Sequence, residues 1–142
     1  MRHIFLDTNV LIDFLANRPP FSLESAKLFN YCFKKFVKIY VSAVSYNNLY
    51  YIIRRSTGHD STIKMLNELQ AWTETVEVTR EVIHSSLISD FHDFEDAIQY
   101  HSAKRVAKIE CLVTRDTKDY RLSSLPVMTP REALTMIENT GR

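Results

Sequence analysis

Short segments of strand-like length alternate along this chain with longer segments that have the periodicity of amphipathic helices. The strand-like segments are His3–Leu6, Lys38–Val41, Thr75–Val78, Cys111–Thr114 and Pro126–Met128. Between the first two, Leu23, Ala26 and Phe29 recur at the spacing of one helix face. Strands that alternate with helices in this way predict an α/β fold with a mainly parallel sheet.

Length and composition suit one domain that spans residues 1–142. The chain is 45% hydrophobic and has only two Gly and four Pro, which favours long regular elements around one core. No apolar run approaches the roughly 18 residues of a membrane span, and Asp7 and Asn9 interrupt the amino-terminal run, unlike a secretory signal. We therefore expect a cytoplasmic protein with no membrane segment. Cys32 and Cys111 are too few for a disulfide framework.

Basic residues gather in three places, although the formal net charge of +1 gives no global sign of nucleic-acid binding. The groups are Lys34, Lys35 and Lys38; Arg54 and Arg55; and Lys104, Arg105 and Lys108. Each is typical of a solvated helix face. Bases of this kind can also surround a cleft that is lined by acids.

Carboxylates occur where an α/β sheet places its ligands. Asp7 directly follows the first expected strand, and Asp116 follows the strand at 111–114, with Asp119 three residues later. Ligands of open α/β sheets bind beyond the carboxyl ends of the strands. A third set, made of Asp93, Glu95 and Asp96, opens an expected helix. Carboxylates gathered in one cleft repel each other unless a cation compensates them, and oxygen ligands without a His or Cys set indicate Mg²⁺ or Mn²⁺.

Each of these acids also has an ordinary structural explanation. Asp7 could cap the helix that follows it. The acids at 93–96 suit the positive end of a helix dipole, and Asp116 and Asp119 are common turn residues. The pattern of acids alone therefore leaves the metal site as a hypothesis.

Three segments resemble the motifs of PIN domains, the fold of the VapC-like toxins. Residues 6–13 read LDTNVLID and resemble the opening motif, while residues 94–99 read FEDAIQ and resemble the Asp-Ala segment. Residues 113–120 read VTRDTKDY and resemble the closing Thr-Arg-Asp/Asn segment. The three occur in the family's order and cover nearly the whole chain. The resemblance implies a three-layer α/β/α fold with a central sheet of four to five strands.

The resemblance also implies an activity and a site. Relatives of this kind are Mg²⁺- or Mn²⁺-dependent endoribonucleases, which implies RNA as substrate, a homodimer, and a small antitoxin partner that blocks the cleft. The family's catalytic and metal-binding roles fall on Asp7, Asp96 and Asp116. Further contributors to the site would be Asn9, Asn48, Asp93 and Asp119. The basic residues that we expect to contact RNA are Arg54, Arg55, Lys104 and Arg115.

One position departs from the family pattern. PIN domains usually carry a Glu in the helix after the second strand, and Asn48 falls where that Glu would be. An amide oxygen can bind a hard cation but adds no negative charge. The departure supports an alternative, namely a PIN-fold module with weak catalysis that binds RNA or a protein.

Two further alternatives remain open. A phosphatase of the haloacid-dehalogenase kind also has an Asp after its first strand, but that family needs a second Asp where this chain has Asn9. Tyr46, Tyr50 and Tyr51 could stack on unpaired bases, although an aromatic stripe with this spacing is more typical of a core or a dimer interface.

Overall fold

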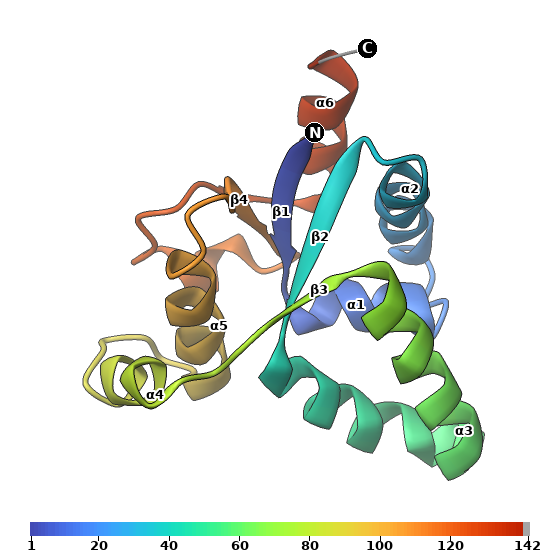
Figure 1. Ribbon diagram of the computed structural model, residues 1–142, viewed down its shortest axis with the longest axis horizontal. Helices are drawn as coiled ribbons and strands as arrows, with labels where there is room; N and C mark the ends of the chain where they lie inside the picture. Colours follow the sequence, from blue (N-terminus) through green and yellow to red (C-terminus); the bar gives the residue numbers. More distant parts are fainter. Residues whose placement is uncertain (141–142) are drawn as a thin grey trace.

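The five strand-like segments form one parallel sheet in the computed structural model, which describes residues 1–140 (Figure 1). The strands are β1 (Arg2–Leu6), β2 (Val37–Ser42), β3 (Glu74–Val76), β4 (Cys111–Val113) and β5 (Val127–Met128). They lie in the order β3-β2-β1-β4-β5, and each neighbouring pair is parallel. The predicted α/β fold with a parallel sheet is confirmed.

Within the described residues, six α-helices and one 3-10 helix, η1 (Thr117–Tyr120), accompany the sheet. The α-helices are α1 (Thr8–Leu15), α2 (Ser22–Phe33), α3 (Ala43–Trp72), α4 (Arg80–Leu87), α5 (Phe94–Lys104) and α6 (Pro130–Asn139). Within residues 1–140 no helix has the length and apolar character needed to cross a lipid bilayer.

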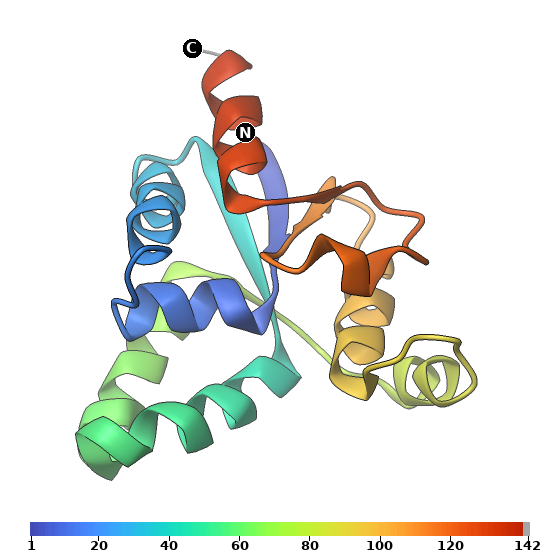
Figure 2. The same cartoon turned by 180° about the vertical axis from the view of Figure 1, so that it is seen from behind.

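Side chains of β1 alternate between two hydrophobic cores, which makes the fold three-layered. Ile4 and Leu6 pack in a large core with residues of α1, α2, α3 and α6. Phe5 points the other way into a smaller core with Tyr100 of α5 and Tyr120 of η1. All three β1 side chains are fully buried, so the central strand reads as a continuous apolar run. The views from both sides show the helices on either face of the sheet (Figures 1 and 2).

The position of β1 determines where a ligand can bind. From β1 the chain passes through α1 and α2 to β2 on one side, while β4 pairs with β1 on the other side. The connections that leave β1 and β4 therefore diverge, and they open a crevice beyond the carboxyl ends of these two strands.

The segment α3 runs from Ala43 to Trp72 but consists of two helices that meet in a kink at Gly58, which has a φ of 80° and a ψ of 174°. Glycine adopts this positive φ without the steric cost of a Cβ. Because Gly commonly ends a helix, the sequence predicts two helices here, and that prediction is confirmed. Asp60, which the sequence offers as the cap of the second helix, lies within its first turn instead. Of the two serines that the sequence offers as caps of the first helix, Ser42 and Ser45, it is Ser42 whose hydroxyl accepts the Val44 amide N–H.

Helix α6 begins with a capping box at Thr129-Pro130-Arg131-Glu132, which the sequence predicts from a Thr followed three residues later by a Glu, with Pro at the first helical position. The Thr129 hydroxyl accepts the Glu132 amide N–H at 3.2 Å, and the Glu132 carboxylate accepts the Thr129 amide N–H at 2.8 Å. Because α6 covers the large core through Ala133, Leu134 and Ile137, this cap stabilises a helix that the sheet needs.

We predict that Thr129→Ala destabilises the protein by about 1 kcal/mol, since the Glu132 amide N–H loses its side-chain acceptor. The melting temperature should fall by about 2–5 °C in a thermal unfolding experiment. Thr135→Ala is the matched control, because Thr135 is exposed in the interior of the same helix and Ala is favoured there. Equal losses in both variants would contradict the capping role.

Candidate active site

Asp7 is a buried carboxylate at the carboxyl end of the central strand. It occupies the N-cap position of α1, but its side chain caps no backbone amide of that helix. Its two oxygens instead accept hydrogen bonds from Thr114 Oγ1 at 2.7 Å and from Gln99 Nε2 at 2.8 Å. Only 5% of the residue is exposed, and burial raises the pKa of Asp7 despite these bonds. The capping explanation offered by the sequence is therefore wrong for this side chain.

A chain of hydrogen bonds connects Asp7 to Asp96. The Gln99 amide nitrogen that donates to Asp7 also donates to the Tyr120 hydroxyl oxygen at 3.2 Å. The Tyr120 hydroxyl in turn donates to Asp96 Oδ1 at 3.1 Å. The Gln99 carbonyl oxygen accepts the Thr8 amide N–H at 3.2 Å, which sets the orientation of the amide group. Side chains of α5 and η1 therefore hold the two carboxylates in one arrangement.

Charges near Asp96 disfavour its ionised form. Burial is the largest cause, followed by the negative charges of Asp7 and Asp93, and together they raise the pKa of Asp96 from 3.8 to about 7. Asp93 also accepts the Asp96 amide N–H at 3.0 Å and so caps α5, and Asp96 lies in the first turn of that helix, as the helix-dipole explanation expects. Asp96 thus lies in a negative environment that a cation would relieve.

Asp116 joins this group from the loop after β4. Its carboxylate accepts a hydrogen bond from Asn9 Nδ2 at 3.3 Å, and its amide N–H donates to Thr114 Oγ1 at 3.1 Å. Asn9 Oδ1 accepts the Arg115 amide N–H at 3.4 Å. Asn9 and Thr114 therefore connect the opening motif at residues 6–13 with the closing motif at residues 113–120.

These acids line one open cavity of about 480 Å³. Six carboxylates reach it, from Asp7, Asp93, Glu95, Asp96, Asp116 and Asp119. Asn9 and the helix residues Asn48, Tyr51 and Ile52 complete much of the wall, and no Lys or Arg of residues 1–140 lines the cavity. The expected acids therefore lie at one cavity, together with Glu95, which was not among the predicted site residues.

The donors of this cavity fit a hard divalent cation. Carboxylate and amide oxygens line it, without Cys or His. Within residues 1–140 no three Asp, Glu, His or Cys side chains lie close enough together to bind one metal ion directly. Mg²⁺ suits this spacing, because it usually keeps several waters and takes only one or two carboxylates directly. We therefore treat Asp7, Asp96 and Asp116 as proposed ligands.

Two of the basic residues expected to bind RNA have other contacts. Arg115 Nε donates to the fully buried Asp13 at 2.6 Å, and the Arg115 guanidinium lies 4.0 Å from the centre of the Phe21 ring. Lys104 lies over the Tyr100 ring and lines a separate pocket between α4 and α5. Neither residue lines the acidic cavity. The contact of Arg115 with Asp13 compensates a buried charge, which is a structural role.

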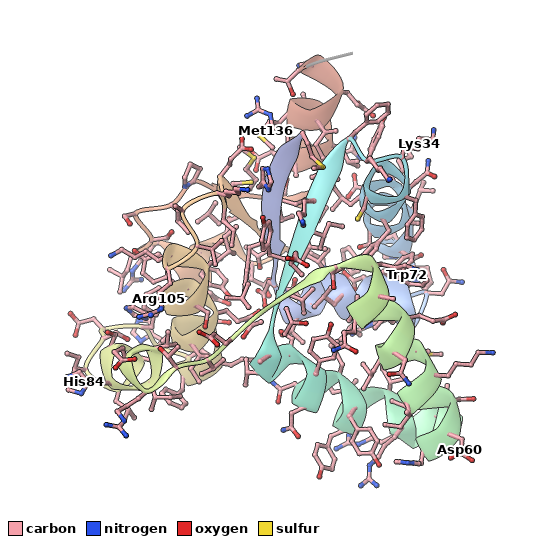
Figure 3. All side chains as sticks on the ribbon, viewed as in Figure 1. Lys34, Asp60, Trp72, His84, Arg105 and Met136 are labelled. Carbon is pink, nitrogen blue, oxygen red and sulfur yellow. The ribbon has the colours of Figure 1, made fainter. Side chains whose placement is uncertain are left out.

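The remaining basic groups lie on different elements. Lys34 lies at the amino-terminal end of the sheet, the same end as Met136, and away from the carboxyl ends of the strands (Figure 3). Arg54 and Arg55 are exposed on α3, one turn beyond the cavity residues Tyr51 and Ile52. Lys104 lies on α5, which also lines the cavity, but at the opposite end of that helix from the cavity acids.

Sequence reasoning missed the residues that orient the carboxylates. Gln99, Tyr120 and Thr114 are all buried and all bind Asp7 or Asp96. Gln99 lies three residues after Asp96, so helical spacing could have drawn attention to it. The sequence gives no comparable signal for Tyr120, whose partners come from distant segments.

A family model described as a PIN domain matches residues 3–118 of the chain. The chain belongs to the PIN-domain family. This membership sets aside the haloacid-dehalogenase alternative, and it agrees with the fold and with the order of the three motifs. Among curated proteins, none matches the sequence.

Solved structures share the PIN fold at low sequence identity. DNA-bound VapBC from Salmonella typhimurium is 15% identical, with a TM-score of 0.67 over 92% of this chain and 99% of that chain. A toxin–antitoxin complex from Klebsiella pneumoniae is 20% identical, with a TM-score of 0.65 over 89% of this chain and 97% of that chain. VapC20 from Mycobacterium tuberculosis, described as a toxin that cleaves the sarcin–ricin loop, is 14% identical, with a TM-score of 0.61 over 77% and 86% of the two chains.

We predict that Asp96→Asn stabilises the metal-free PIN domain at pH 8. The native pKa of Asp96 is about 7 and its ordinary value is 3.8, so the native state binds more protons between these pH values. The contribution of Asp96 to the free energy of unfolding is therefore fully present below about pH 4 and is lost as the pH rises towards 7. The neutral amide escapes this loss, so its melting temperature in EDTA should exceed that of the parent by about 2–5 °C at pH 8.

The same comparison at pH 4.5 should give a much smaller difference, because Asp96 is then largely protonated in the native parent protein. Asp60→Asn is the control, since Asp60 is exposed on α3 and should show no change at either pH. A variant that is less stable than the parent at pH 8 would show that the carboxylates do not repel each other.

Proposed function

We propose that this PIN-domain protein is a metal-dependent endoribonuclease that hydrolyses RNA phosphodiesters and acts as the toxin of a toxin–antitoxin pair. The observation that carries the proposal is the cavity beyond β1 and β4, which is lined by six carboxylates and by no Lys or Arg. Such a surface repels a phosphate backbone on its own. It becomes a site for phosphodiester chemistry only with a bound cation.

Asp7, Asp96 and Asp116 would hold Mg²⁺ or Mn²⁺, with Asn9, Asp93 and Asp119 nearby. When bound, the metal lowers the pKa of a coordinated water and neutralises charge on the phosphate. The protein contributes orientation, because Thr114 and Gln99 fix the Asp7 carboxylate and Tyr120 fixes that of Asp96. Glu95 accepts a hydrogen bond from Thr8 Oγ1 at 2.7 Å and can orient a water at the same cavity.

Partners are proposed from the fold relatives. Several solved relatives are VapBC or toxin–antitoxin complexes, which supports an antitoxin that covers the cavity of this protein. A homodimer and a cytoplasmic location remain part of the proposal and rest on the family resemblance.

The direct test is cleavage of single-stranded RNA by purified protein in Mg²⁺, followed on a denaturing gel. Asp116→Asn and Asp96→Asn should each lower the rate by at least about 100-fold, since even residues that only support metal ligands contribute about 10- to 100-fold. EDTA should abolish cleavage, and Asp60→Asn should cleave at the parent rate. Cleavage that survives EDTA or both substitutions would exclude this mechanism.

Asn48 supplies a second test because it lines the cavity without adding charge. Asn48→Glu should lower the Mg²⁺ concentration that gives half-maximal cleavage and raise the rate, since a further carboxylate attracts the ion more strongly. Asn48→Asp controls for the extra methylene of Glu. Equal metal dependence in all three proteins would show that Asn48 lies outside the metal site. A parent protein that binds RNA without cutting it, at any Mg²⁺ concentration, would favour the weakly catalytic module.

A further inference from the structure

One face of the first half of α3 leads out of the acidic cavity. Asn48, Tyr51, Ile52 and Arg55 follow each other at the spacing of one helix face, and the first three line the cavity. Arg55 lies seven residues after Asn48, so this face extends roughly 10 Å along the helix axis. Its chemistry changes along that distance from an amide, through an aromatic and an aliphatic side chain, to a cation.

Tyr51 is exposed, unlike an aromatic residue of the core. It is 51% exposed, and its neighbour Ile52 is 45% exposed. By contrast, Leu49 and Ile53 of the same helix are buried in the large core. The sequence favoured a core or a dimer interface for the tyrosines; Tyr51 lies outside the core, at the rim of the cavity.

Two neighbouring side chains, those of Tyr50 and Arg54, contact the Tyr51 ring. The Tyr50 ring contacts it edge-on, with 5.1 Å between centroids and an interplanar angle of 80°. The Arg54 guanidinium carbon lies 5.1 Å from the Tyr51 centroid and 5.6 Å from that of Tyr50. The Tyr50 hydroxyl is also hydrogen-bonded to His59 Nδ1 at 2.9 Å. These contacts cover only part of the ring, since Tyr51 is 51% exposed, and the uncovered part is accessible to a further planar group.

The charge of this segment matches that of a nucleic-acid backbone. No carboxylate occurs between Ala43 and Gly58, whereas Arg54 and Arg55 are both exposed there. A basic peptide would be repelled by these two cations. Aromatic rings beside exposed cations are the usual platform for single-stranded nucleic acid, in which bases stack and phosphates pair with the cations.

We propose that Tyr51 is the stacking platform for an unpaired base next to the phosphate in the acidic cavity, and that Arg54 and Arg55 bind the phosphates beyond it. The inference rests on the proposed function for the nature of the substrate. It adds a subsite on α3 that takes one unpaired base of the RNA. A duplex keeps its bases stacked in pairs and cannot offer one to Tyr51.

The test measures binding of a short, fluorescently labelled single-stranded RNA by anisotropy, in the Asp116→Asn background with Mg²⁺. Gels confirm that the RNA stays intact. Tyr51→Leu should weaken binding about 5- to 150-fold, the range for loss of one stacked base, whereas Tyr51→Phe should keep it. Phe33→Leu is the matched control, because Phe33 is 49% exposed on α2 and lies outside this face. Melting temperatures should be unchanged in the two Tyr51 variants, whereas Phe33→Leu also loses a ring contact with Trp72.

Two further readouts separate stacking from a general loss of affinity. A fluorescent adenine analogue placed in the RNA should be quenched on binding to the parent and to Tyr51→Phe, but not on binding to Tyr51→Leu. Arg55→Gln should reduce the slope of log affinity against log salt concentration by about 0.7. Arg105→Gln, at the C-cap of α5, should leave that slope unchanged.

Equal RNA affinities for Tyr51→Leu and Tyr51→Phe would overturn the subsite and leave this face to a protein partner. Tight binding of the matching duplex that is equally sensitive to Tyr51→Leu would also overturn it. A protein that cuts no RNA but shows the predicted Tyr51 dependence would refute the nuclease and retain the subsite, so the two proposals fail separately.

Discussion

The carboxylate of Asp7 is buried at the end of the central strand, and the surrounding elements are arranged to hydrogen-bond it. A buried charge without hydrogen-bond partners is costly. The two oxygens of Asp7 therefore accept hydrogen bonds from Thr114, directly after β4, and from Gln99 on α5. Gln99 then binds Tyr120 of η1, so the same network reaches the chain after β4. Three segments that follow β1 by about a hundred residues in the sequence are thereby held against it.

Even with these bonds, the cavity is an unfavourable place for negative charge. Burial raises the pKa of Asp7, and Asp7 in turn contributes to the raised pKa of Asp96. A fold selected only for stability would have little reason to keep six carboxylates at one cavity without a basic residue. The contrast with Asp13 is instructive, since that fully buried carboxylate is paired with Arg115. The protein compensates the carboxylate that stabilises its fold and leaves the cavity acids uncompensated, which is the pattern expected where a cation completes the site.

Acidic and basic side chains occupy different regions of the molecule, and the overall net charge does not reveal this separation. The acids converge on the cavity, whereas Arg54 and Arg55 lie just beyond it on α3 and Lys34 lies at the opposite end of the sheet. Helix α3 belongs to both regions, because its buried side supports the large core and its exposed side carries Tyr51. Gly58 ends this basic half of the helix by turning the chain. A near-neutral protein can therefore present a cation site and an anion-binding rim side by side.

The sequence by itself determined the order of strands and helices, the capping box of α6, and the positions of Asp7, Asp96 and Asp116 at the ends of β1 and β4 and in the first turn of α5. These features depend on local periodicity, on local caps and on short motifs that also identify the PIN family. Only the tertiary structure decided which side chains meet. It paired Arg115 with Asp13, brought Gln99 and Tyr120 to the carboxylates, left the Asp7 side chain free of a capping role, and exposed Tyr51. Each of these outcomes depends on how distant segments pack around the sheet, and a hydrogen bond between residues a hundred positions apart leaves no periodic trace in one sequence.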